Sequence, residues 1–272
     1  MKVAYQGERG SYSEEALISF FKEKAVPVPF PTISDVFRAV ENSVCEAGII
    51  PVENSIGGNV YESYDNLLNS RLHISGETFL RIRHCLIAIP GSSIEGVLEV
   101  YSHPQALEQC RNKLEALGVS IKAAYDTAGS VKLVRERNDL SIAAVASKRA
   151  AELYGLEVLI EGIEDFDDNF TRFLIISKEE GKRGEENKTT VVFSVENRPG
   201  ALYKALSIFA NAKINLTKIE SRPTKRVPWE YYFIVDFDGH IQERRISDAV
   251  RMLEKNTAKC RILGSYARGK IE

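Results

Sequence analysis

A short charged segment divides the chain into two parts. Residues 178–188 read KEEGKRGEENK, in which eight of eleven residues are charged and two are glycine. Because such a stretch offers no apolar side chains to a core, we expect it to join two separately packed domains. The length of 272 residues agrees with two domains of about 100 to 200 residues each. We predict domains at residues 1–178 and 189–272, with a linker at residues 179–188.

The first part alternates short apolar runs with helical patterns, which is typical of an α/β fold with largely parallel strands. Val3–Tyr5 and Ala47–Val52 fit buried strands, and Ser11 followed by Glu14 is a capping box at a helix start. This helix would bury one face that contains Ala16, Leu17, Phe20 and Phe21. The alternation continues through Val97–Tyr101, Thr127–Arg137, Ile142–Ala146 and Phe173–Ile176.

The second part has a different order of patterns. It predicts strand, helix, strand, strand, helix and strand, which is the βαββαβ order of a ferredoxin-like domain. The predicted elements are strand 190–195, a helix from Pro199, strands 216–221 and 231–237, helix 246–255 and strand 261–266.

The composition excludes several classes of partner. Lys and Arg number 36 and Asp and Glu 38, so the formal charge of −2 supplies no field for a nucleic acid or an anionic membrane. Charges at Glu8 and Arg9 interrupt the amino-terminal apolar run before a signal peptide could form, and the apolar runs elsewhere are strand-sized. The four cysteines are far apart, which indicates reduced thiols in a cytoplasmic protein.

Cofactor motifs are also missing from the sequence. The loop that begins at Tyr5 has two glycines where a dinucleotide fingerprint needs three, and no Walker-type loop follows a strand. The four histidines show no metal-binding pair, and no serine lies in a Gly-x-Ser-x-Gly elbow. We therefore expect neither a cofactor nor a metal.

Three polar segments follow predicted strands, which is where ligands bind in open α/β sheets. The segments are Gly7–Ser13, Pro51–Val60 and Glu164–Phe173. In the first segment, the glycines and the start of a helix would suit binding of a carboxylate. In the third segment, the planar guanidinium of Arg172 could bind a carboxylate with two hydrogen bonds. Each segment has a structural alternative: an ordinary turn, a helix cap, or a surface ion pair of Arg172. His103 and Thr127 lie at helix starts, where capping is the alternative to binding.

Taken together, these segments resemble the prephenate dehydratase family. Gly7–Ser13 is similar to its glycine and hydroxyl loop, Val52–Gly58 to its Glu-Asn-Ser loop, and Thr171-Arg172-Phe173 to its signature triplet. Residues 102–106, SHPQA, match a further family segment. Glu8 stands where proline is expected and Ser11 where threonine is usual. The chain starts directly in a strand, without the chorismate mutase module of bifunctional relatives, which implies a single activity.

The resemblance implies a catalytic domain like a periplasmic binding protein, with lobes at about 1–78 with 160–178 and at 79–159. The substrate would be prephenate, converted to phenylpyruvate, water and carbon dioxide without a cofactor. Thr171 would donate a hydrogen bond to the departing hydroxyl, and Arg172 would hold a carboxylate; Glu53 is the alternative proton donor. The implied catalytic residues are Glu53, Asn54, Ser55, Thr171, Arg172 and Phe173. The implied substrate-binding residues are Gly7, Gly10, Ser11, Tyr12, Ser13, Gly57, Gly58, His103 and Thr127.

In the small domain, RPGAL at 198–202 and INLTKIESRP at 214–223 resemble the phenylalanine-binding motifs of an ACT domain. The resemblance implies feedback control by L-phenylalanine bound between paired ACT domains of a homodimer or homotetramer. The implied phenylalanine-binding residues are Gly200, Ala201, Leu202, Asn215, Leu216, Glu220, Ser221, Arg222 and Pro223. Two other functions stay open: arogenate dehydratase, which acts on the amino analogue, and a non-enzymatic amino-acid sensor.

Overall fold

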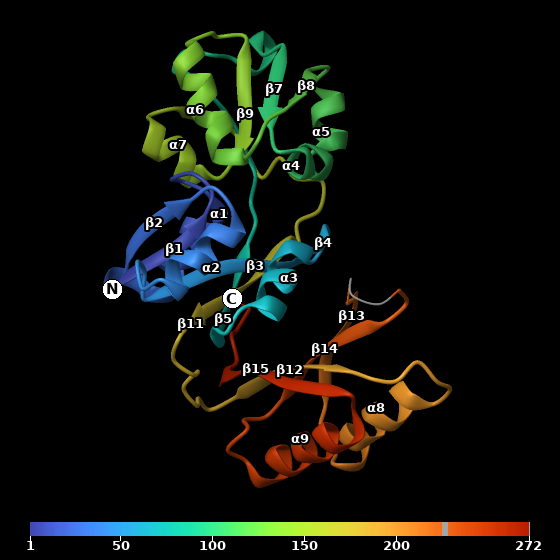
Figure 1. Cartoon of the computed structure of the whole chain (residues 1–272). Helices are drawn as coiled ribbons and strands as arrows, with labels where there is room; N and C mark the ends of the chain where they lie inside the picture. The colour runs from blue at the N-terminus through green and yellow to red at the C-terminus, as the bar shows by residue number, and fades with distance from the viewer. Residues whose placement is uncertain (225–227, 272) are drawn as a thin grey trace. The chain divides into compact units, whose positions relative to one another are not determined.

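The computed structural model describes residues 1–224 and 228–271 and divides into two compact units. The first unit contains residues 1–64 and 78–173 together with Ile271, and the second contains residues 65–77 and 174–270 (Figure 1). Helix α3 (Tyr61–Asn69) and strands β5 (His73–Arg81) and β11 (Phe170–Ser177) each contribute residues to both units. In the described residues, no helix has the length and apolar character that crossing a membrane requires.

One lobe of the first unit is built on the sheet order β2-β1-β3-β11. Strand β1 pairs in parallel with β2 and with β3, as the alternating pattern predicts, and the short β4 pairs antiparallel with the end of β3. The elements are β1 (Lys2–Gln6), α1 (Tyr12–Phe21), η1 (Lys22–Lys24), β2 (Val26–Phe30), α2 (Ile33–Glu41), β3 (Ala47–Asn54) and β4 (Gly58–Asn59).

The other lobe has a sheet in the order β10-β6-β9-β7-β8. Strand β7 is parallel to β8 and β9, but β6 is antiparallel to β9 and β10, so the prediction of largely parallel strands is wrong for this edge. The elements are β6 (Cys85–Ala88), η2 (Ile94–Gly96), β7 (Glu99–Ser102), α4 (Pro104–Gln109), α5 (Arg111–Ala116), β8 (Ser120–Ala123), α6 (Thr127–Arg137), β9 (Ile142–Ala146), α7 (Lys148–Tyr154) and β10 (Glu157–Glu161).

Helices cover both faces of this second sheet, which explains why its strands β6 and β9 are continuously apolar. Successive residues of β6 alternate between two cores: Ile87 packs with residues of α6 and α7, whereas Leu86 packs with residues of α4 and α5. Both faces of the strand are therefore buried, and no polar residue interrupts it.

The second unit confirms the predicted βαββαβ order. Its sheet has the order β13-β14-β12-β15, with neighbouring strands antiparallel, and β15 also pairs with β5 at Ile74. One core lies between the sheet and its two helices and includes Phe193, Phe209 and Phe237. The elements are β12 (Asn187–Ser194), α8 (Ala201–Asn211), β13 (Leu216–Pro223), β14 (Tyr231–Asp238), α9 (Arg244–Asn256) and β15 (Lys259–Ala267).

The charged segment at 178–188 packs more closely than its composition predicts. Strand β12 already begins at Asn187, and Lys188 is only 5% exposed. Its ammonium lies 2.8 Å from a carboxylate oxygen of the buried Glu77, which supplies the opposite charge that a buried lysine needs. The expectation that no residue of this segment can pack is therefore wrong, because the ion pair with Glu77 allows the charged Lys188 to be buried.

The start of α1 follows the capping prediction with one difference. The Ser11 hydroxyl accepts a hydrogen bond from the Glu14 backbone N–H, but the Glu14 carboxylate accepts one from the Gly10 N–H at 2.7 Å. The Glu14 carboxylate thus binds Gly10, the residue before the N-cap Ser11, and not the N-cap itself. Ala16 and Leu17 are fully buried, whereas Phe20 is 40% exposed, so the apolar face is narrower than predicted.

Gly10 joins the two lobes of the first unit. Its carbonyl accepts a hydrogen bond from Ser147 at 2.7 Å, its φ is +87°, and a Cβ placed on it would lie 2.9 Å from the Ala150 Cα. Glycine is required here for its conformation and for the close approach of α7.

We expect Gly10→Ala to lower the free energy of unfolding by about 2 to 4 kcal/mol. The loss would come from the strain of alanine at positive φ and from the clash of its Cβ with the Ala150 backbone. Gly118→Ala is the matched control, because Gly118 also has positive φ (+68°) but nothing within 4 Å of an added Cβ. It should lose only about 1 to 2 kcal/mol. Urea denaturation of both variants measures the difference, and equal losses would contradict the close-packing explanation.

Candidate functional site

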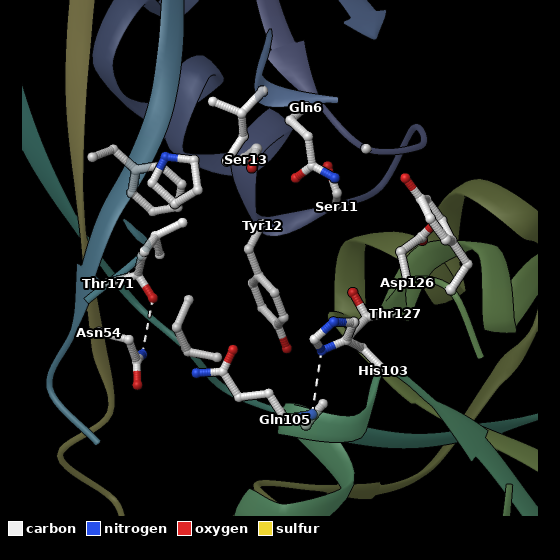
Figure 2. A pocket seen from close by; sticks show the side chains of 18 of the residues that line it. Gln6, Ser11, Tyr12, Ser13, Asn54, His103, Gln105, Asp126, Thr127 and Thr171 are labelled. Atoms are coloured by element: carbon white, nitrogen blue, oxygen red, sulfur yellow. Dashed lines mark hydrogen bonds between the residues drawn. The ribbon is translucent and has the colours of Figure 1, made fainter. Parts of the chain in front are cut away.

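A cavity of about 400 Å³ lies in the first unit, lined by residues from both of its lobes. Figure 2 shows Tyr12 projecting into it from α1, with Asn54 and Thr171 on one side and His103, Asp126 and Thr127 on the other. This volume suits a small organic ligand.

Nine of the residues that the sequence indicates for catalysis or substrate binding line this cavity. They come from the loop after β1, from the ends of β3 and β11, and from the starts of α4 and α6. They are Gly7, Ser11, Tyr12, Ser13, Asn54, His103, Thr127, Thr171 and Phe173. Segments far apart in the sequence thus meet at one site, although their individual roles stay predictions.

The structure does not bring Arg172 or Glu53 to the lining of the cavity. Successive side chains of a strand point to opposite faces, so Arg172 in β11 lies between the pocket-lining Thr171 and Phe173, and Glu53 precedes Asn54 in β3. Arg172 is buried and Glu53 is half-buried. The carboxylate clamp by Arg172 and proton donation by Glu53 stay predictions.

Four other predicted residues support the site without lining it. The Ser55 hydroxyl donates to the Asp168 carbonyl and accepts from the Phe170 N–H, both at 2.9 Å, and so fixes the segment before Thr171. At Gly57, an added Cβ would overlap the Gln105 side chain, which lines the cavity. Gly10 contacts α7, as described above, and Gly58 has a φ of +76° at the start of β4.

Several lining residues carried no signal in the sequence. His84, Gln109, Gln6 and Thr32 all line the cavity, yet none belongs to a motif that we identified. Gln109 lies one turn after Gln105 on α4, so helical spacing from the SHPQA segment could have indicated it. His84 had no comparable indication, since a single histidine before a strand has many structural roles.

Helix starts surround the cavity. Residues at the amino-terminal ends of α1, α2, α4 and α6 line it, and each of these helices is capped by a side chain: Ser11, Thr32, His103 and Asp126. Exposed N–H groups and the helix dipole give each start a partial positive charge. Among the described residues that line the cavity there is no lysine or arginine. The arrangement suits an anion held by N–H and hydroxyl groups.

A hydrogen-bonded group of amides adjoins Thr171. The Asn54 Nδ2 donates to Thr171 Oγ1 at 3.0 Å and to Asn169 Oδ1 at 2.7 Å, and Gln109 Nε2 donates to Asn54 Oδ1 at 3.2 Å. Because an amide nitrogen cannot accept a hydrogen bond, the Thr171 oxygen must be the acceptor. The proton of the Thr171 hydroxyl is therefore available to donate to a ligand in the cavity.

Burial changes the acidity of two groups in the cavity. Desolvation lowers the pKa of His84, so its neutral form is favoured, and desolvation raises the pKa of the Tyr12 hydroxyl. Within residues 1–224 and 228–271, no three His, Cys, Asp or Glu side chains are grouped as a metal site would require.

Comparisons with known proteins identify the family of the chain. A family model for prephenate dehydratase matches residues 3–181, and one for the ACT domain matches residues 189–253. The enzyme named arogenate dehydratase/prephenate dehydratase 2 of Arabidopsis thaliana is 44% identical over 98% of this chain and 72% of its own length.

Two solved structures are similar over the whole chain. Prephenate dehydratase from Arthrobacter aurescens in complex with L-Phe is 32% identical, with a TM-score of 0.91 over 98% of this chain and 90% of that one. GqqA, described as a novel type of quorum quenching acylase, is 35% identical, with a TM-score of 0.90 over 98% of both chains. The chain belongs to the prephenate dehydratase family and is a hydro-lyase with an ACT domain at its carboxyl end.

Proposed function

We propose that this enzyme converts prephenate to phenylpyruvate, water and carbon dioxide, and that Thr171 assists departure of the ring hydroxyl. The observation that carries the proposal is the hydrogen bond from Asn54 to Thr171 Oγ1 in the lined cavity. That bond uses the threonine oxygen as an acceptor and leaves its proton available to donate to a ligand. A donated hydrogen bond stabilises the charge that develops on a leaving oxygen.

The chemistry requires little more from the protein. Loss of carbon dioxide leaves the electron pair that expels the hydroxyl, and the ring becomes aromatic, so the reaction itself supplies much of the driving force. The protein has to hold two carboxylates in the reactive geometry and stabilise the departing hydroxide. The four helix starts around the cavity support carboxylate binding without a lysine or arginine in the described lining.

We expect Thr171→Ala to lower kcat by about 100-fold or more, by analogy with removal of one transition-state donor. Thr171→Ser is the matched control, because it keeps the hydroxyl and should retain kcat within about 10-fold. Steady-state kinetics with prephenate measures both variants, and circular dichroism checks their folding. A folded Thr171→Ala variant with the wild-type kcat would exclude the assignment.

Arogenate is the second candidate substrate, and one feature of the cavity favours it. Arogenate carries an ammonium where prephenate carries a keto group, and the carboxylates of Glu62 and Asp126 line the cavity. A carboxylate near the ligand would favour an ammonium group. The name of the Arabidopsis relative includes both activities.

Competition between the two substrates decides between them. If arogenate is preferred through Asp126, we expect Asp126→Asn to lower kcat/KM for arogenate by about 10-fold and leave that for prephenate within about 2-fold. Asparagine also caps helices, so α6 should keep its start. If the wild-type enzyme has a higher kcat/KM for prephenate than for arogenate, and Asp126→Asn changes both values by the same factor, the result supports prephenate. No turnover of either substrate leaves an amino-acid sensor as the remaining candidate.

We also propose that L-phenylalanine regulates the enzyme through the ACT domain of a homodimer or homotetramer. The proposed binding residues cluster on two elements. Gly200, with a φ of +79°, precedes α8, which begins at Ala201 and Leu202, and residues 216–223 form β13 at the sheet edge. Asn215 donates to Asp238 at 3.0 Å just before β13. The Arthrobacter relative was solved with L-Phe, which supports this effector.

Helix α3 offers a physical route for this regulation. Arg222 of β13 pairs with Asp65 of α3 at 2.9 Å, and Arg261 of β15 donates to the carbonyls of Leu67 and Ser70 near the end of the same helix. Both contacts lie within the second unit. Glu62, in the first turn of α3, lines the cavity of the first unit. A change in β13 can therefore act on a helix that reaches the active site.

We expect Asp65→Asn to reduce the change in kcat/KM that phenylalanine produces, by about 5-fold or more, while the activity without phenylalanine stays within about 2-fold. Asp248→Asn is the control, because Asp248 forms only exposed ion pairs on α9. Activity titrated with phenylalanine measures both variants. An unchanged phenylalanine response in a folded Asp65→Asn variant would contradict the route, and no response in the wild type would contradict regulation itself.

A further inference from the structure

His84 is a buried polar residue with a hydrogen bond at each ring nitrogen. Its side chain is 2% exposed, its Nε2 lies 3.0 Å from Gln109 Oε1, and its Nδ1 lies 2.8 Å from the Tyr12 hydroxyl. It belongs to none of the motifs that indicate the active site. A buried histidine with two defined partners is held in one orientation, which raises the question of what depends on it.

The surrounding amides have only one consistent arrangement of donors and acceptors. Backbone N–H groups of Ile56 and Gly57 donate to the Asn54 side chain at 3.1 and 2.6 Å, so that atom must be the amide oxygen. The other end of Asn54 is then the nitrogen, which donates to Thr171 Oγ1. The backbone therefore fixes which way Asn54 faces.

The orientation of Asn54 determines that of Gln109. The Gln109 atom that faces the Asn54 oxygen has to be a donor, so it is the nitrogen. The Gln109 oxygen then faces His84 and also accepts from Asn169 Nδ2 at 3.0 Å. Reversal of Gln109 would place two acceptors together at Asn54.

The Gln109 oxygen in turn determines the tautomer of His84. Nε2 must carry a proton in order to donate to this oxygen, so in the neutral ring Nδ1 is the acceptor that faces the Tyr12 hydroxyl. That hydroxyl shares its one proton between Nδ1 and the Arg83 carbonyl, which lies 3.0 Å away. Burial lowers the pKa of His84 and favours that neutral ring. The charged group that faces it is Glu164, whose carboxylate accepts the His84 backbone N–H at 2.8 Å.

We propose that His84 is a positioning residue for Thr171. Its Nε2 proton holds the Gln109 amide, Gln109 adds a hydrogen bond to the Asn54 oxygen that the backbone already binds, and Asn54 donates to the Thr171 oxygen, whose own proton stays available to the substrate. Amide side chains pass on hydrogen-bond polarity but do not carry protons, so His84 acts on orientation and not as an acid. The inference rests on the proposed role of Thr171 in the dehydration.

Two matched variants separate the two hydrogen bonds of the ring. The amide nitrogen of His84→Gln can occupy the place of Nε2 and keep the bond to Gln109, whereas the shorter amide of His84→Asn reaches only the place of Nδ1. We expect His84→Gln to keep kcat within about 5-fold and His84→Asn to lose about 10- to 100-fold with little change in KM, as expected for a misplaced catalytic group. Equal losses in both folded variants would overturn the proposal.

A double-mutant cycle checks the route through Gln109. Gln109→Met has a similar volume but no amide, so His84→Asn added to it should change kcat by less than about 2-fold. A role of His84 in general stability would instead lower kcat by the same factor in both backgrounds, and that result would overturn the proposal.

A measurement without turnover keeps this inference separate from the proposed function. Nitrogen-15 NMR of the histidine side chains, assigned with His84→Gln, should show a protonated Nε2 and an unprotonated Nδ1 for His84. The opposite tautomer would overturn the inference even in an active enzyme. Absence of dehydratase turnover in the wild type, with the expected tautomer present, would contradict the proposed function alone.

Discussion

The active site depends on the fixed amide of Asn54. Two backbone N–H groups of the turn after β3 bind its oxygen, so its nitrogen faces the start of β11, where acceptors of Asn169, Phe170 and Thr171 share its two hydrogens. The Asn54 side chain thus orients the end of β3 against the start of β11. Since the same oxygen also accepts from Gln109, the polarity set by a short turn extends across the cavity to the second lobe.

Helix starts supply positive partial charge to the cavity, whose lining also contains the carboxylates of Glu62 and Asp126. Four helix starts supply backbone N–H groups and helix dipoles. Folding has already removed the partial charges of these groups from water. A buried lysine or arginine would require a partner whenever the site is empty, and an anionic substrate would have to displace that partner. Fixed dipoles avoid this requirement.

Ionic pairs hold the parts of the second unit that the sequence leaves polar. Lys188 pairs with Glu77 in a buried position, and Arg222 and Arg261 hold α3 through Asp65 and through helix carbonyls. The strength of ion pairs and hydrogen bonds depends on the direction of approach more than that of apolar contacts does. These contacts therefore define the orientation of α3 on the sheet.

Local patterns were enough to predict the βαββαβ order of the second unit and several elements of the first, because apolar periodicity is local: Ile142–Ala146 and Thr127–Arg137 match their elements residue for residue. The sequence also indicated Asn54 and Thr171 through their motifs. Only the tertiary structure decided which neighbours face the cavity, since strand register turns Thr171 inward and leaves Arg172 outside the lining. It alone brought His84 to Gln109 and Asn54 to Asn169, because contacts between residues 25 and 115 positions apart depend on packing and not on local pattern.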